Sequence, residues 1–147
     1  MSKQVLSIDQ MKHLKELGLN IERASFLVYI DRLRDKYSED HIFNTPTPSS
    51  LFEYEVETFP VFSLYDIIDL LPKELDIDVF CHKWFLMIDY QYLDISYSYM
   101  SESGALYSIK RISVKDIGLI NGAYEMLCWC LENGYVEKDF EDYETKV

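Results

Sequence analysis

Residues 93–109 alternate between apolar and polar side chains on both sides of a turn. The first arm sets apolar positions Leu93, Ile95, Tyr97 and Tyr99 against Asp94, Ser96 and Ser98. Ser101–Gly104 has the composition of a turn, and Ala105, Tyr107 and Ile109 lead the returning arm. Because a period of two places alternate side chains on opposite faces, the pattern predicts an antiparallel β-hairpin.

Three further segments favour strands. Residues 25–30 are rich in β-branched and aromatic residues, although a helix over 20–37 is a competing interpretation from the spacing of Ala24, Leu27, Ile30 and Leu33. Residues 51–57 alternate, which predicts a half-buried strand with Glu53, Glu55 and Glu57 on its outer face. Residues 84–90 are apolar on both faces, as in a central strand covered on both sides. Residues 38–50 contain two prolines and predict a loop.

Three helices are indicated by their ends and their apolar spacing. Ser7 and Gln10 form a capping box for the first helix, which Gly18 ends. Ser63 caps the second helix, and Pro72 helps to end it. The third helix is expected from Ser113 to Gly134. Its inner stripe is Ile117, Ile120, Tyr124, Leu127 and Leu131, widened by Ala123, Cys128 and Cys130.

These elements predict an α+β fold. With 147 residues, 48% of them hydrophobic, the chain has the size of one domain, 1–147, in which residues 137–147 form a frayed acidic tail. We expect a largely antiparallel sheet of about five strands with three helices against one face. The expected order is α-β-β-α-β-β-β-α.

The formal charge of −12 disfavours direct binding to nucleic acid or to an anionic membrane. No signal peptide or apolar run of membrane-spanning length is present, and three irregularly spaced cysteines form no disulfide framework. These features predict a cytoplasmic protein.

Candidate chemical groups are scattered. The histidines, at positions 13, 41 and 82, have no partner at zinc-like spacing. Cys128 and Cys130 stand roughly 200° apart on a helix, and Cys81 and His82 would point to opposite faces of a strand. A weak cation site in the Asp76–Asp78 loop is less favoured than a solvated acidic loop. We therefore expect no catalytic residue, no metal and no cofactor.

Two stretches, FPVFSLYDIIDLLPKEL (59–75) and NGAYEMLCWCLENGYV (121–136), resemble segments of a family of small acidic proteins from gut bacteria and their phages and prophages. The opening LKELGLN (14–20) is similar to that family as well. The resemblance implies an origin in a mobile genetic element and the same order of elements. It assigns no function and no catalytic or binding residues.

The sequence favours a non-enzymatic accessory protein of a phage or prophage that acts by protein–protein contact. One alternative is an acidic inhibitor or immunity protein that mimics nucleic-acid charge, with Glu53, Glu55 and Glu57 as a partner-binding row for a basic host or phage protein. Another alternative is a small enzyme with an acidic, metal-assisted pocket.

Overall fold

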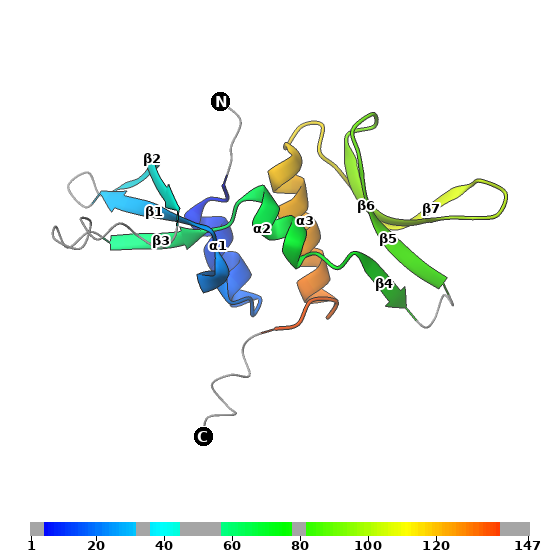
Figure 1. The fold of residues 1–147 in the computed structure, drawn as a ribbon, viewed down its shortest axis with the longest axis horizontal. Helices are drawn as coiled ribbons and strands as arrows, with labels where there is room; N and C mark the ends of the chain where they lie inside the picture. The colour runs from blue at the N-terminus through cyan, green and yellow to red at the C-terminus, as the bar shows by residue number, and fades with distance from the viewer. Residues whose placement is uncertain (1–4, 32–35, 45–56, 78–81, 139–147) are drawn as a thin grey trace, which may run out of the picture.

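Two antiparallel sheets lie on either side of a layer of helices (Figure 1). The structure, a computed structural model, describes residues 5–31, 36–44, 57–77 and 82–138. Within these ranges the helices are α1 (Ile8–Glu16), the 3₁₀ turn η1 (Ile21–Arg23), α2 (Leu64–Leu70) and α3 (Leu119–Glu132). The strands are β1 (Phe26–Asp31), β2 (Lys36–Asn44), β3 (Glu57–Val61), β4 (Glu74–Ile77), β5 (His82–Asp89), β6 (Asp94–Met100) and β7 (Leu106–Ser113).

The α+β class, the three helices and the antiparallel pairing are confirmed. The prediction of one sheet of about five strands is wrong, because the strands divide into β2-β1-β3 and β4-β5-β6-β7. The expected order also lacked two elements, β2 and β4. Each sheet has its own helical neighbour, since α1 packs on β3 while α3 packs on β6 and β7. The helices therefore lie between the sheets instead of against one of them (Figure 1).

The first sheet confirms the predicted strand at residues 25–30 and excludes the competing helix. The predicted loop at 38–50 is wrong over its first part, because β2 runs to Asn44 and pairs with β1. Pairing to a well-formed neighbour overrides the weak strand propensity of this polar segment. β3 is an edge strand, a position that tolerates Pro60. Residues 51–56 of the predicted acidic strand lie outside the described ranges.

The second sheet contains the hairpin predicted at residues 93–109, as β6 and β7. β5 is central in this sheet, but the expectation that both its faces are covered is wrong. Trp84 is buried, whereas its neighbour Phe85 is 46% exposed. The strand is apolar on both faces although only one face packs against the protein. β4 was not predicted, because it has only four residues and begins two residues after Pro72.

Capping fixes α1 and α2 as predicted. The Ser7–Gln10 capping box is formed, and Gly18 follows α1 in the left-handed conformation. At α2 the Ser63 hydroxyl accepts from the backbone N–H of Asp66, and the Asp66 carboxylate accepts from the backbone N–H of Ser63. The same carboxylate accepts from the Ser25 backbone at 3.1 Å, so α2 is tied to the start of β1.

α3 begins later than predicted, after Gly118. Ser113 belongs to β7, and the next backbone N–H, of Val114, donates to Leu93 at 2.8 Å. Gly118 then adopts φ 84°, which ends the turn before the helix. Ile117 precedes α3 and is partly exposed, so it is not part of the inner stripe. Of the other predicted members, Ile120, Ala123, Leu127, Cys128, Cys130 and Leu131 are buried, whereas Tyr124 is only partly buried against the core.

Candidate functional site

The side of the second sheet that faces away from α3 is only partly covered. We call it the open face. It carries Phe85 and Met87 of β5, Ser96, Ser98 and Met100 of β6, and Leu106, Ser108 and Arg111 of β7. The opposite face presents Ile95 and Tyr97, both fully buried, to α3. Strand alternation therefore separates a core face from the open face within one sheet.

A chain of polar side chains crosses the floor of the open face. Arg111 stands opposite Ser96, so its long side chain reaches the diagonal neighbour Asp94. The Arg111 Nε lies 3.4 Å from the Asp94 carboxylate, and Nη2 donates to the Ser108 hydroxyl at 3.3 Å. The Asp94 side chain is only 12% exposed and that of Arg111 is 52% exposed. A buried carboxylate thus holds a guanidinium that remains half open to solvent.

Three serine hydroxyls continue this chain. The Ser108 and Ser98 oxygens are 2.7 Å apart, and the Ser98 and Ser96 oxygens are 2.8 Å apart. Ser96 and Ser98 are buried, and the mutual hydrogen bonds satisfy their hydroxyls. The floor is therefore polar, pre-arranged and linked to the guanidinium of Arg111.

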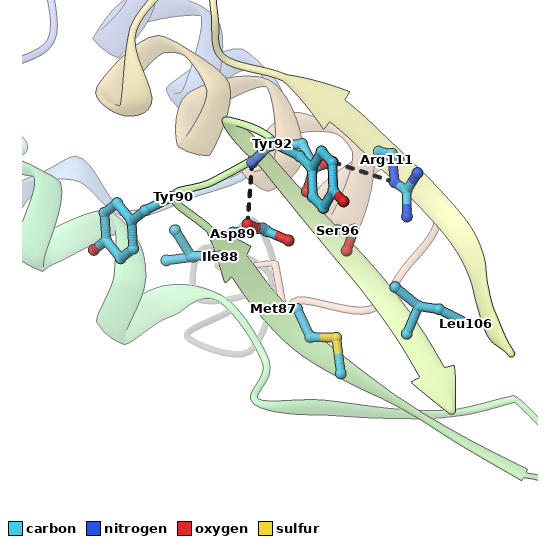
Figure 2. A pocket seen from close by; sticks show the side chains of 9 residues that line it. Met87, Ile88, Asp89, Tyr90, Tyr92, Ser96, Leu106 and Arg111 are labelled. Atoms are coloured by element: carbon cyan, nitrogen blue, oxygen red, sulfur yellow. Dashed lines mark hydrogen bonds and ion pairs between the residues drawn. The ribbon is translucent and has the colours of Figure 1, made fainter. Parts of the chain in front are cut away.

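A groove of about 540 Å³ lies along this floor at the end nearest the β5–β6 turn. Figure 2 shows Met87 of β5 and Leu106 of β7 on either side of Ser96, with the ring of Tyr92 beside Arg111. The residues that line the groove are Met87, Ile88, Asp89, Tyr90, Tyr92, Asp94, Ser96, Leu106 and Arg111. An apolar lining with a few convergent polar groups, in this size range, is typical of binding sites.

The β5–β6 turn places the two tyrosines at the rim. The Asp89 carboxylate accepts from the backbone N–H groups of Gln91 and Tyr92, at 2.8 and 3.1 Å, and so closes the turn. Leu93 completes it with φ 53°, a left-handed conformation that costs a non-glycine residue about 1 kcal/mol. Tyr90 and Tyr92 remain exposed at the mouth of the groove.

The predicted acidic row is not brought into this site. Glu53 and Glu55 lie outside the described residues, and Glu57 is the first residue of β3, paired with Ile30 of β1 in the other sheet. The row therefore stays a prediction. Asp76 belongs to β4 and Asp78 lies outside the described ranges, so the acidic loop expected there is in part a strand.

The histidines and cysteines are also separate from the groove. His13 lies on α1, His41 in β2, and the His82 ring packs 3.9 Å from that of Tyr99 between ring centroids. Burial raises the pKa of both Cys128 and Cys130 to about 11. Both thiols are free and buried, as the sequence predicted, and a raised pKa leaves little thiolate at neutral pH. Cys81 lies outside the described part of the chain.

Neither a metal-binding cluster nor a membrane-spanning helix is found in the described part of the chain. Among residues 5–31, 36–44, 57–77 and 82–138, no group of three or more His, Cys, Asp or Glu side chains is placed to hold a metal ion. In the same part of the chain, no helix has the length and apolar character needed to cross a membrane.

The groove was not predicted from sequence, although one signal for it exists. Alternation in residues 93–109 already separates Asp94, Ser96 and Ser98 from the core positions. The pairing partner of these residues depends on the register of the hairpin and on the bulge between Tyr97 and Ser98. Only that register brings Arg111 to Asp94.

No protein family, curated protein or solved structure matches the chain in comparisons with known proteins.

Proposed function

We propose that the chain is a non-enzymatic accessory protein of a phage or prophage and that it acts by protein–protein contact through the open face. The observation that carries the proposal is the presence of exposed apolar side chains on the open face and at the rim of its groove. Tyr92 at the rim is 72% exposed, and on the open face Met100 is 64% and Phe85 46% exposed. Exposed apolar groups gathered in one place mark interaction sites, and Tyr, Phe, Met and Arg are the residues enriched in the buried centres of interfaces.

The arrangement of Arg111 supports recognition as its role. A guanidinium held by Asp94 and Ser108 loses little side-chain freedom on binding, which lowers the entropic cost of a contact. The ring of Tyr92 and the side chain of Met87 supply apolar area beside it. This combination of a rigid charge with aromatic and thioether surface is typical of interface hot spots.

The state of the titratable groups supports a non-enzymatic role. Asp89 closes the β5–β6 turn and Asp94 pairs with Arg111, so both groove carboxylates already serve the fold. Burial raises the pKa of the Cys128 and Cys130 thiols to about 11. At neutral pH little of either thiol is therefore the thiolate that a nucleophile needs. The phage or prophage origin is supported only by the resemblance of residues 14–20, 59–75 and 121–136.

The test is affinity capture from a lysate of the organism that encodes the chain, followed by mass spectrometry. The variant Phe85→Ser/Met100→Ser removes apolar area from the open face without touching the core. Tyr65→Ser is the control, because Tyr65 is also a large exposed side chain but lies on α2. We expect the wild type and the control to retain the same protein and the double variant to lose it. Retention of that protein by all three chains would refute the proposal.

A further inference from the structure

β7 is an edge strand whose second side is open within the described part of the chain. It is the last strand in the order β4-β5-β6-β7 and has eight residues, against four in the opposite edge strand β4. An edge strand presents backbone N–H and C=O groups that another chain can pair with. The groove borders this edge, because Leu106 and Arg111 belong to β7.

Two backbone hydrogen bonds fix which backbone groups of β7 face outward. The Val114 N–H donates to Leu93 at one end of the hairpin, and the Ser101 N–H donates to the Ala105 carbonyl at the other, both at 2.8 Å. Bonded and non-bonded pairs alternate along an antiparallel ladder. The residues that turn their N–H and C=O away from β6 are then Leu106, Ser108, Arg111 and Ser113.

The outward backbone groups thus belong to residues whose side chains lie on the open face. A strand added beside β7 would place its own alternate side chains next to Arg111 and Leu106. The bulge between Tyr97 and Ser98 separates the outward groups into two short stretches. An added segment would therefore pair with one stretch at a time and bind with modest affinity.

The charge of this edge differs from that of the whole chain. β7 (Leu106–Ser113) contains Lys110 and Arg111 and no acidic residue, although Arg111 pairs with Asp94 of β6 and the chain carries a net charge of −12. A second copy of β7 laid against this edge would bring like charges together, which opposes pairing. An acidic segment would instead find opposite charge and a guanidinium already oriented by Asp94.

We propose that β7 binds an extended acidic segment of a partner protein as an added strand. A carboxylate of that segment pairs with Arg111, and an apolar side chain of it enters the groove between Met87 and Leu106. This inference rests on the proposed function and specifies how its partner docks. It uses strand addition, in which backbone pairing supplies affinity and alternate side chains supply specificity.

The first experiment selects short random peptides displayed on phage against the full chain. We expect the selected peptides to carry Asp or Glu alternating with apolar residues. Arg111→Gln should weaken their binding at least about tenfold, as for loss of a charge-assisted contact. Lys83→Gln is the matched control, because Lys83 lies in the same sheet and pairs with the exposed Glu74, and it should change binding by less than about twofold.

A second variant tests the backbone contact. Ser113→Pro removes an N–H that faces outward, so the ladder with β6 is kept while strand addition is blocked. With peptide bound, the outward amides of Arg111 and Ser113, which belong to the stretch that carries the contacted guanidinium, should exchange hydrogen more slowly. The inward amides of Tyr107, Lys110 and Ile112 serve as the reference and should not change. A circular dichroism melt checks that each variant is folded.

Several results would overturn the inference. These are selected peptides without acidic residues, binding that is unaffected by Arg111→Gln or Ser113→Pro, and a concentration-dependent dimer that Ser113→Pro abolishes. The last would assign the edge to a second copy. If Phe85→Ser/Met100→Ser loses the captured partner while Ser113→Pro keeps it, strand addition fails and the proposed function stands. If neither variant loses the captured partner, strand addition and the proposed function both fail.

Discussion

Gly122 offers a test of the packing of α3 against the second sheet. A Cβ added at Gly122 would clash with Cγ1 of Val114, and it would lie 3.4 Å from the Val114 Cβ and 3.7 Å from Cγ2 of Ile95. Val114 and Ile95 are buried, and a β-branched side chain has few alternative rotamers. The absence of a side chain at Gly122 is therefore what allows this close approach.

The sign of Gly122→Ala depends on two opposing effects. Gly122 is the fourth residue of α3, and replacing a helical glycine by alanine stabilises a helix by up to about 1 kcal/mol. Overpacking a well-filled core costs about 1–3 kcal/mol. We expect the second effect to dominate and the free energy of unfolding to fall by about 1 kcal/mol, which lowers the melting temperature by about 4 °C in a chain of this size.

A double-mutant cycle isolates the contact. Val114→Ala alone removes two buried carbons and should cost about 1.6 kcal/mol. Combined with Gly122→Ala, the new methyl group occupies the vacated space, so the double variant should be more stable than the sum of the single changes by about 1–2 kcal/mol. Urea denaturation followed by circular dichroism measures all four chains. A Gly122→Ala variant more stable than the wild type, with no coupling to Val114→Ala, would refute the packing described.

Three other predictions follow from the core, the thiols and the charge. Leu127→Asp should unfold the chain, because it puts an unpaired charge at a fully buried position. Tyr65→Asp, at an exposed position on α2, should leave the melting curve unchanged. A normal melting curve for Leu127→Asp would show that α3 faces solvent. The buried thiols of Cys128 and Cys130, whose pKa is raised to about 11, should resist alkylation at neutral pH. Burial raises the pKa of both thiols in the folded state above the unfolded value. The stability that the protonated thiols contribute is therefore present below pH 9 and is lost as pH rises through 11. A melting temperature that stays constant between pH 9 and pH 11 would contradict the raised pKa values. A triple Glu→Gln change at Glu53, Glu55 and Glu57 tests the hypothesis that this acidic row binds a basic protein. The change should weaken capture of a basic protein without lowering stability. Unchanged capture together with more self-association would show that the acidic row only keeps the chain soluble.

The elements that could be predicted from sequence carry strong local signals. Ser7 and Ser63 cap their helices through short-range hydrogen bonds, and the hairpin at residues 93–109 combines alternation with a turn. These patterns depend on neighbours within a few residues, so no knowledge of tertiary structure is needed.

The elements that could not be predicted depend on distant partners. β2 is polar and becomes a strand by pairing with β1, and β4 is too short to show a period. Ser113 resembles a helix cap, but β7 continues to that residue because Ile112 pairs with Ile95 of β6. The division into two sheets likewise follows from which strands pair, which single-strand patterns do not encode.

The groove could be predicted only in part. The alternation of Asp94 and Ser96 with core residues indicated a polar face, but Arg111 joins them through the register of a bulged hairpin. The open side of β5 was hidden by its composition, since Phe85 and Met87 are apolar and yet line a surface. Apolar residues on both faces of a strand indicate burial unless one face is kept for a partner, and sequence alone does not separate the two cases.

The central claim is that the open face contacts a partner protein, and site-specific photo-crosslinking tests it most directly. A photoreactive phenylalanine analogue is placed at Phe85 on the open face or at Tyr65 on α2, both exposed, in cells of the organism that encodes the chain. We expect one discrete adduct with another protein from position 85 and none from position 65. Adducts of the same protein from both positions, or from position 65 alone, would contradict it.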